Sequence, residues 1–375
     1  MSAARWRRAM KTGAAPTSFA GGTGSRLSAG DSATTQEPNA LQRLISRIRL
    51  RHTLVLVGLL VFPFVATPFF TFQVASQSLV LGLIALSLSF LAGYGGMVSL
   101  AQMTVAGIAG YTVAVLGTSS SPEISLGWSW YVAVPFAILI AVLCSGVIGW
   151  LSVRTEGIYT IMITLAIGVA FYYLVLQNYS VFNGFQGLRE LKAPVVMGVN
   201  MRDSLPFYFL CLGCALAGYL FVSYLVRAPF GMALQGIRDN PRRMASLGFS
   251  VVTHRVAAYA VAGLLAAVGG ILLAWYNALM SPGSVGTSWL INILIIAVLG
   301  GVKHPLGAFL GALVYVLLQT FAIDVIDRER FNLVIGSVFL AIVLFSPDGL
   351  LGLWAKLRFR FGSKRAITST KRRLP

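Results

Sequence analysis

The sequence predicts an all-α fold, a polytopic transmembrane bundle of about ten helical spans, some of them broken. Two observations predict it. The chain is 57% hydrophobic and only 11% charged, whereas soluble domains carry about 25% charged residues. Apolar runs of the length that a bilayer requires recur from residue 54 onward, and basic residues gather between these runs and in both tails. The net charge of +18 therefore indicates a lipid bilayer as partner, and not a nucleic acid.

The two ends of the chain differ from its centre. Residues 1–40 are rich in Ser, Thr, Ala and Gly and lack apolar periodicity, so we expect a disordered N-terminal tail. The membrane domain is expected over residues 41–350, and a basic C-terminal tail follows over residues 351–375. Residues 41–51 fit two interpretations, an amphipathic helix on the membrane surface or a plain basic flank of the first span.

Each candidate span is judged against the roughly 20 apolar residues that a helix needs to cross a bilayer. Pro63 and Pro68 should kink the first span, because proline removes a backbone donor. Gly300, Gly301 and Pro305 predict a turn between the eighth and ninth spans. The ten spans are expected at about 54–70, 73–93, 103–118, 130–151, 157–177, 206–226, 255–276, 288–301, 305–323 and 331–347.

The distribution of charge predicts how these spans are oriented. With the N-terminus inside the cell, the inside segments hold 24 basic and 5 acidic residues, a net charge of +19. The outside segments then hold 5 basic and 6 acidic residues, a net charge of −1. Basic residues concentrate in cytoplasmic segments. Both termini and the long polar loop over residues 227–255 are therefore expected in the cytoplasm.

The loop over residues 227–255 carries its own helix signals. Asn240 is a good N-cap, Pro241 suits the first helical position, and Gly248 suits the left-handed position past the helix end. These residues predict a two-turn helix over about 241–247, preceded by another over about 231–238. A short helix with its own caps favours a docking element for a partner. An ordinary basic cytoplasmic loop remains the alternative.

Residues 93–112 interrupt an apolar helix at membrane depth. Several glycines, together with Ser99 and Gln102, break the apolar pattern there. Irregular backbone is tolerated inside a membrane only where it is buried in protein or lines a cavity. Broken helices also present helix ends that can meet a polar solute. The pattern favours a solute path along this segment, and a kink that serves packing alone is the alternative.

The spans carry few groups that could do chemistry. No Asp, Glu, Lys, Arg or His lies well inside any expected span, which argues against an ion-coupled secondary carrier. The sequence shows neither a P-loop nor a nucleophile with its base, so no enzyme and no catalytic residue is expected. Cys211 and Cys214 form a C-x-x-C without further ligands nearby, so no metal site is expected.

Three separated stretches carry a resemblance to a known family. GYGGMVSLAQMTVAGIAGYT, at residues 93–112, is similar to the G-Y-x-G-x-x-S-L signature of branched-chain amino-acid ABC permeases of the LivM type. GIRDNPRRMASLGF, which starts at Gly236, resembles the cytoplasmic loop of that family. SPGSVGTSWLINILIIAVLGG, which starts at Ser281, resembles its S-P-x-x-F and L-G-G segment. The resemblance runs in order and at matching spacing from about residue 80 to 350.

The resemblance implies an ABC importer permease that works with several other chains. Two ATP-binding subunits would bind on the cytoplasmic side, a second related permease would complete the path, and a substrate-binding protein would deliver solute from outside. The partner subunits would bind ATP, so this chain would need no cofactor. It would lie in the bacterial plasma (inner) membrane and carry leucine, isoleucine, valine or related small amino acids. Urea or short amides are the alternative cargo.

The resemblance also implies two groups of site residues. The chain departs from the family at two places: Ala245 stands where the family often has Glu, and His304 and Pro305 replace parts of its glycine-rich turn. These departures leave the expected fold unchanged, but they leave the identity of the substrate open. The coupling loop that would seat in the ATPase is expected to act through Arg238, Asp239, Asn240, Pro241, Arg242, Arg243, Ala245 and Gly248. The translocation path is expected to be lined by Gly93, Gly96, Ser99, Gln102, Gly107, Tyr111, Gly300 and Gly301.

The charge asymmetry makes the orientation testable by labelling single cysteines in intact cells. A membrane-impermeant thiol reagent should label Ser120→Cys, in an outside loop, and should leave Ser250→Cys unlabelled until the cells are broken. Labelling of position 250 but not of position 120 in intact cells would show that the predicted topology is inverted.

Overall fold

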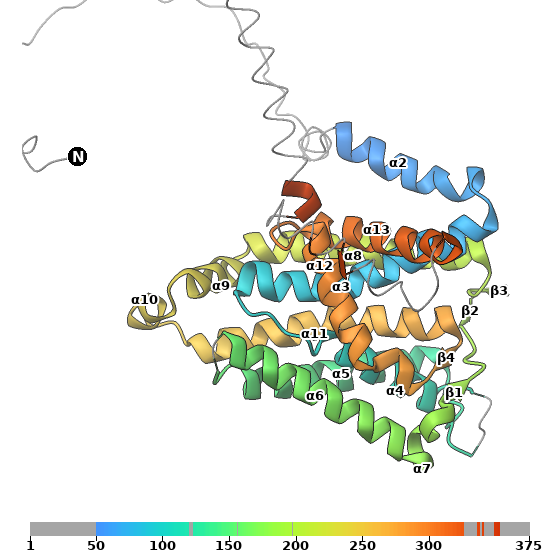
Figure 1. The fold of residues 1–375 in the computed structure, drawn as a ribbon, viewed down its shortest axis with the longest axis horizontal. Coiled ribbons are helices and arrows are strands. Elements are labelled where there is room, and N and C mark those ends of the chain that lie inside the picture. Colours follow the sequence, from blue (N-terminus) through green and yellow to red (C-terminus); the bar gives the residue numbers. More distant parts are fainter. Residues whose placement is uncertain are drawn as a thin grey trace, which may run out of the picture. The chain divides into compact units, whose positions relative to one another are not determined.

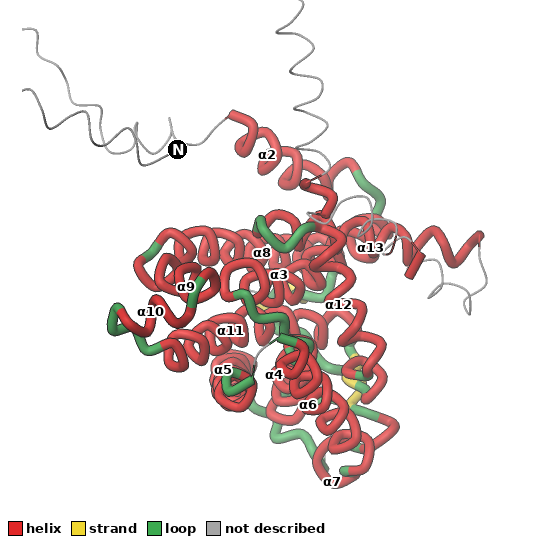
Figure 2. The backbone as a smooth tube through the Cα atoms, turned by 60° about the vertical axis from the view of Figure 1, so that its left-hand side comes forward, coloured by secondary structure: helices red, strands yellow, loops and turns green. Residues whose placement is uncertain are grey.

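The computed structural model describes residues 50–119, 123–155, 157–196, 198–325, 336, 337, 340 and 349–352. The chain divides into two units, residues 1–57 and 58–375, and the second unit forms the helical bundle. Helices make up nearly all of the described part (Figure 2). The predicted all-α membrane fold is therefore confirmed. The N-terminal tail, residues 41–49, nearly all of the C-terminal tail and nearly all of the tenth expected span lie outside the described residues.

The elements follow one another with short connections, and the strands are only two residues long. The helices before the long loop are α2 (Leu50–Val65), the π-helix η1 (Phe70–Ser76), α3 (Gln77–Gly95), α4 (Gln102–Leu116), α5 (Trp130–Ser152), α6 (Ile158–Gln177), α7 (Tyr179–Phe182), the 3-10 helix η2 (Gly184–Gln186) and α8 (Ser204–Arg227). Those that follow are α9 (Pro229–Asp239), α10 (Pro241–Ser246), α11 (Val251–Asn277), the 3-10 helix η3 (Pro282–Val285), α12 (Thr287–Gly300) and α13 (Pro305–Val325). The strands are β1 (Leu188–Arg189), β2 (Val195–Val196), β3 (Val199–Asn200) and β4 (Leu279–Met280).

The described helices match nine of the ten expected spans within a few residues, but the number of membrane crossings stays a prediction. Five described helical segments are long and apolar enough to cross a bilayer alone. Helix α4, with 15 residues, is shorter than a full crossing. Helices α12 and α13 pass the same test only together and are bent by 117° at their break, which confirms the expected turn between them.

The entry into the second span differs from the expected kink. Helix α2 ends at Val65, and the chain breaks over residues 66–67 before the helix resumes. The residue before a proline is pushed out of helical geometry, which accounts for the break ahead of Pro68. The π-helix η1 then leads without a gap into α3, so that residues 70–95 form one continuous segment of 26 residues, long enough to cross a bilayer.

Helices α3 and α11 form the centre of the bundle. In the most apolar 18 residues of each segment, 89% of the segment formed by η1 and α3 is buried, and 67% of α11 is buried. Helix α11 packs against α3, α4 and α5. Helices α5, α6 and α8 are far more exposed and present large apolar side chains such as Leu143, Met162 and Tyr224. These outward faces suit contact with lipid tails or with another membrane chain.

Small residues let the central helices approach one another closely. A Cβ at Gly270 of α11 would collide with the backbone carbonyl of Ala106 in α4. A Cβ at Gly300 would collide in the same way with the carbonyl of Gly307, and one at Gly311 with that of Ile296. These glycines therefore serve backbone-to-backbone packing, which is how helices associate in lipid.

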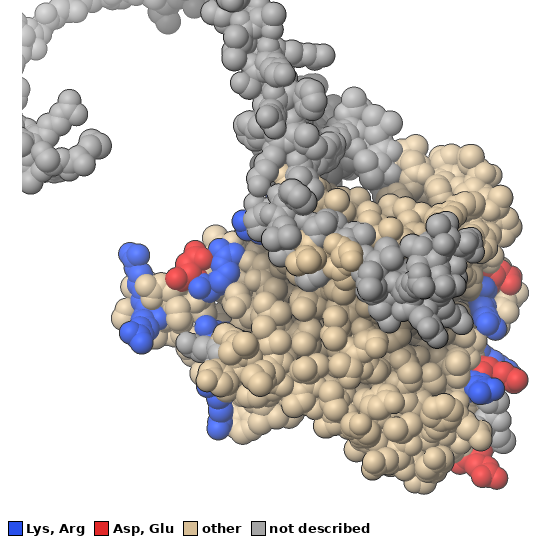
Figure 3. Space-filling view, in the orientation of Figure 1, with Lys and Arg blue, Asp and Glu red and all other residues tan. Residues whose placement is uncertain are grey.

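The long helices run between two chemically distinct ends of the bundle (Figure 1). One end carries α9 and α10, and we call it the loop end. The other carries α7 and the strands, and we call it the strand end; there β1 pairs with β4, and β2 pairs with β3. On the face shown in Figure 3, Lys, Arg, Asp and Glu gather at these two ends and leave a broad uncharged belt between them. This distribution suits a protein whose middle lies in hydrocarbon.

The contact at Gly270 yields a stability prediction. Gly270→Ala should destabilise the protein by about 1–3 kcal/mol, because α4 and α11 would have to move apart. The unfolding midpoint in detergent, measured by heating or by denaturant, would report the change. Gly146→Ala and Gly213→Ala are matched controls, since nothing lies within 4 Å of a Cβ at either helical position. Equal losses in all three variants would contradict the packing argument.

Candidate functional site

The loop end is built on α9, a helix with one buried face. Pro229 occupies its first turn, and Gly231, Ala233, Leu234 and Ile237 are buried against the bundle. The corner with α8 is tight, because a Cβ at Gly231 would meet the backbone of residues 225–226.

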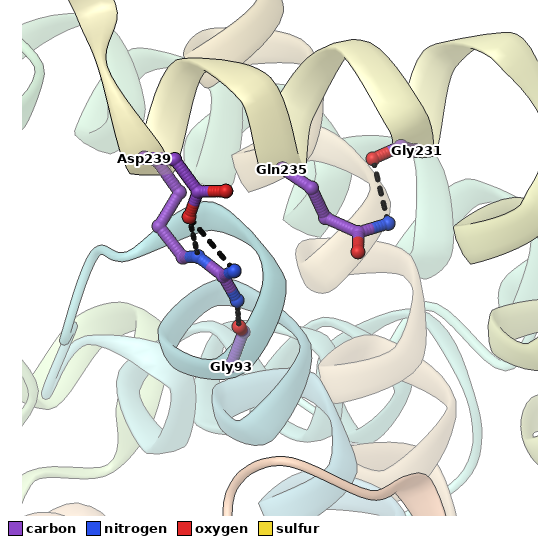
Figure 4. Close-up of polar contacts among 5 residues, drawn as sticks. Gly93, Gly231, Gln235 and Asp239 are labelled. Atoms are coloured by element: carbon purple, nitrogen blue, oxygen red, sulfur yellow. Dashed lines mark hydrogen bonds and ion pairs between the residues drawn. The ribbon is translucent and has the colours of Figure 1, made fainter. Parts of the chain in front are cut away.

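The amide of Gln235 donates hydrogen bonds from Nε2 to the carbonyl oxygens of Val226 and Gly231, both at 3.1 Å, and the second bond is drawn in Figure 4. These bonds satisfy a carbonyl at the end of α8, which no longer has a partner inside its own helix. The corner therefore fixes the direction of α9.

Helix α10 forms as the sequence predicts. The side-chain Oδ1 of Asn240 accepts a hydrogen bond from the backbone N–H of Arg243 at 3.0 Å, as an N-cap does. Pro241 occupies the first turn, and Gly248 has a φ of +91°, the left-handed region that glycine enters without strain. The caps of this helix are thus local, and its shape does not require a partner.

The outer surface of the loop combines charge with apolar side chains. Arg242, Arg243 and Ala245 are exposed. Beyond α10, Leu247 is 66% exposed and Phe249 is 40% exposed. The ring of His254 contacts the rings of both Phe230 and Phe249, which ties the loop to the start of α11. Large apolar side chains on a polar loop are a feature of surfaces that bind other proteins.

Unlike Arg242 and Arg243, Arg238 turns the end of its side chain toward the bundle. Its Nη1 donates a hydrogen bond to the carbonyl oxygen of Gly93, at the end of α3. Its Nε and Nη2 donate to Oδ1 of Asp239 at 3.0 and 2.9 Å (Figure 4). The aliphatic stem of Arg238 also covers Gly96, where a Cβ would meet its Cγ at 2.5 Å. The loop is thus in direct contact with residues 93–112, which we call the broken element.

The break after α3 confirms the interruption that the sequence predicts. Helix α3 ends at Gly95, Gly96 has a φ of +67°, and α4 starts only at Gln102. Between them the backbone N–H of Leu100 donates to Oγ1 of Thr164 in α6, at 3.1 Å. The irregular segment is therefore held by a side chain of another helix, as a buried break requires.

The broken element and the glycine turn near residue 300 lie side by side. A Cβ at Gly93 would collide with the carbonyl of Val302, and the hydroxyl of Tyr94 donates to the carbonyl of Lys303 at 3.2 Å. Of the residues predicted to line the path, Gly93, Gly96, Gly300 and Gly301 therefore belong to one cluster at the loop end.

The other predicted path residues lie deeper and are enclosed by the chain. Ser99 and Gln102 are completely buried, Tyr111 is 1% exposed, and Gly107 packs against Val285. Tyr111 belongs to a separate apolar cluster that includes Leu188 and Met280 of the strand end. The predicted residues thus form a line through the protein rather than one site. Their role in transport stays a prediction.

The bundle encloses several polar side chains, and sequence reasoning singled out only Gln102 and Tyr111 among those without a partner in the described part of the chain. Several of their polar atoms have no hydrogen-bond partner among the described residues, although each is enclosed. Sequence reasoning also missed Thr164, which holds the break at Leu100. The signal for it was its four-residue spacing from Thr160, which places both on one face of α6. Among the described residues, the enclosed atoms without a partner include Arg255 Nε, Gln102 Nε2 and Thr104 Oγ1.

These features define a class, a helical membrane protein with a buried break and an exposed, self-capped helical loop. The chain belongs to the family described as the permease component of branched-chain amino acid transport systems, whose model matches residues 70–343.

Individual relatives agree with this assignment. The chain is 24% identical to the high-affinity branched-chain amino acid transport permease LivM of Escherichia coli K12, over 84% of this chain and 78% of LivM. It is 22% identical to a probable LivM of Methanocaldococcus jannaschii, over 62% and 71% of the two chains. It is 20% identical to the ribose import permease RbsC of Haemophilus influenzae, over 65% and 76%. No solved structure matches the chain significantly.

The enclosed amide of Gln102 yields a prediction. Its Oε1 accepts from Ser87 Oγ at 3.1 Å, whereas its Nε2 has no partner among the described residues. A buried donor without a partner costs about 1–3 kcal/mol. Gln102→Met, which keeps the length and removes the donor, should therefore raise the unfolding midpoint in detergent. Gln177→Met at the exposed end of α6 should leave it unchanged. A lower midpoint for Gln102→Met would show that the amide is satisfied by bound water.

Proposed function

We propose that this chain is the membrane-spanning permease subunit of an ATP-binding-cassette importer for branched-chain amino acids. The observation that carries the proposal is the family match over residues 70–343. The capped helix α10 supports it, because a preformed helix that projects from the loop end with Leu247 exposed is a suitable contact for an ATPase. The chain itself would do no catalysis and would hold no cofactor.

The partners follow from the two ends of the bundle. Two ATP-binding subunits would bind at the loop end, on the cytoplasmic side, where Arg242 and Arg243 present positive charge. A second, related permease would pack against the exposed apolar helices, and a permease named LivH in Methanocaldococcus jannaschii is 26% identical to this chain over 144 residues. The chain would cross the bacterial inner membrane several times, with both termini in the cytoplasm.

The strand end would receive the substrate-binding protein. It is stiffened by the β1–β4 pair, and Nδ2 of Asn183 donates to the carbonyl of Gly187 at 2.9 Å. Beside this turn, Phe185 is 76% exposed and Tyr179 is 66% exposed. Exposed aromatic side chains on a rigid loop are common anchors of protein interfaces. A soluble protein could therefore dock at this end without ordering the loop first.

The proposed solute is uncharged or zwitterionic with an apolar body. The described spans carry no ionised side chain near their middles, so a singly charged solute would lose its hydration without gaining a counter-ion. A zwitterion could be met by helix ends and backbone groups at the break. Urea or short amides would also satisfy this argument, and the ribose permease among the relatives shows that similarity alone does not fix the cargo.

The test is transport by the purified complex in liposomes. The chain, its second permease and the ATPase subunits are reconstituted, and uptake of radiolabelled leucine is measured. Uptake should require both ATP and the substrate-binding protein, and isoleucine and valine should compete. Lysine and glutamate should not compete, because the path offers no counter-ion.

Two outcomes would contradict this proposal. Leucine uptake driven by an ion gradient, without ATP, would place the chain among secondary carriers. ATP-dependent uptake of urea or an amide, with no uptake of leucine, would keep the importer and change its cargo.

A further inference from the structure

The carbonyl of Gly93 needs a partner from outside its helix. The last four carbonyl oxygens of an α-helix lack intrahelical donors, and Gly93 lies within the last turn of α3. The backbone N–H of Met97, which would continue the helix toward it, donates instead to the carbonyl of Leu91 at 3.1 Å. The donor to Gly93 comes from Arg238, 145 residues further along the chain. Arg238 thus caps α3 from another helix.

The charge of this cap matches its position. The C-terminus of a helix carries partial negative charge, so a cation there is favourable. The carboxylate of Asp239 holds the guanidinium by two donors and fixes its direction. The side chain of Arg238 is 37% exposed, whereas that of Asp239 is 68% exposed. The acid therefore faces solvent, and the arginine reaches inward between the two helices.

The same contact is a packing contact. Gly96 lies directly under the stem of Arg238, and one helical turn earlier on α9 the side chain of Leu234 lies near Gly95. The structure shows why glycine suits position 96: its positive φ strains any other residue, and the stem of Arg238 fills the space that a side chain would take. Helix α9 and the end of α3 are consequently joined by both apolar and polar contacts.

The end of α3 also leads to the parts of the protein proposed to form the path. It continues directly into the 97–101 segment, which Thr164 holds at Leu100. Tyr94, one residue after the capped carbonyl, donates to Lys303 in the glycine turn. A displacement of α9 that moves Gly93 would therefore also move the 97–101 segment and the glycine turn near residue 300, and no intervening helix has to transmit it.

We propose that Arg238 is a positioning residue that joins the loop to the broken element as one moving unit, so that movement of α9 and α10 is passed to the 93–101 break. The inference rests on the proposed function, in which the ATPase subunits move the loop. It separates two tasks within the loop. Arg242 and Arg243 are exposed and would serve docking, whereas Arg238 is bonded to Gly93 and would serve transmission.

The decisive measurement is the amount of leucine imported per ATP hydrolysed by the reconstituted complex. In Arg238→Gln the ATPase subunits should co-purify in normal amount, and this ratio should fall about tenfold, the size expected for one lost charge-assisted hydrogen bond. Arg238→Lys should keep most of the ratio, because lysine retains the charge and one donor for Gly93. A residue that only stabilised the fold would lower import and ATP hydrolysis together and leave the ratio unchanged.

Two further variants separate transmission from docking and from general charge. Arg243→Glu should reduce co-purification of the ATPase, because the side chain is exposed in the loop and its charge is reversed. Arg154→Gln removes one positive charge at the end of α5, where the guanidinium stacks on the ring of Trp150, and should leave both co-purification and the ratio unchanged. Loss of ATPase binding in Arg238→Gln, or an unchanged ratio, would overturn the proposal.

A covalent replacement of the contact provides an independent test. A Cβ at Gly96 would lie 3.4 Å from Cβ of Arg238, close to the separation of about 3.8 Å found in disulfides. In a background without the three native cysteines, Gly96→Cys with Arg238→Cys should import poorly when reduced and recover when oxidised. An oxidised, cross-linked complex that stays uncoupled would refute a rigid joint.

Failure of this inference is distinguishable from failure of the proposed function. If the wild-type complex imports no leucine, the proposed cargo is wrong. The ratio is then replaced by the stimulation of ATP hydrolysis by the loaded substrate-binding protein, which should fall in Arg238→Gln and be retained in Arg238→Lys. If the wild-type complex imports leucine and both variants match it, only the role of Arg238 is wrong.

Discussion

The fold depends on one constraint, that a backbone polar group inside hydrocarbon must find its partner within the protein. The break between α3 and α4 leaves backbone groups of this kind without a partner in their own helix. Thr164 satisfies one of them and Arg238 another. The remaining helices wrap this region, which is why α3 and α11 are buried while α5, α6 and α8 expose apolar side chains. The break is thus the feature around which the bundle is arranged.

Close backbone packing follows from the same constraint. In lipid no hydrophobic driving force brings helices together, so their association depends on close van der Waals packing. Gly270 against Ala106, and Gly300 against Gly307, bring main chains together where any side chain would hold them apart. The glycine turn beside the break is held in this way as well, because Gly93 leaves no room between itself and Val302. Packing and the candidate path therefore use the same residues.

Local signals in the sequence were sufficient for the helices and for α10. Asn240, Pro241 and Gly248 act within a few residues of one another, so their caps could be predicted without any tertiary information. The direction of the Arg238 side chain could not be predicted, because its acceptor is a main-chain carbonyl 145 residues away. Nothing in a sequence marks one main-chain carbonyl as an acceptor over another. Strands β1 and β4 were missed for the same reason, since β1 forms only against β4, about 90 residues later. The enclosure of Gln102 also depends on how distant helices pack.

The contact between Arg238 and Gly93 has a genetic consequence. Its acceptor is a main-chain oxygen, which no codon change can alter or remove. An ordinary ion pair can be rebuilt by exchanging its two members, but in this contact only one member is encoded by a side chain. Charge-swap suppressors of an Arg238 mutation should therefore not arise at position 93. Suppressors should instead map to residues that supply a new donor to the end of α3 or that brace α9 against it.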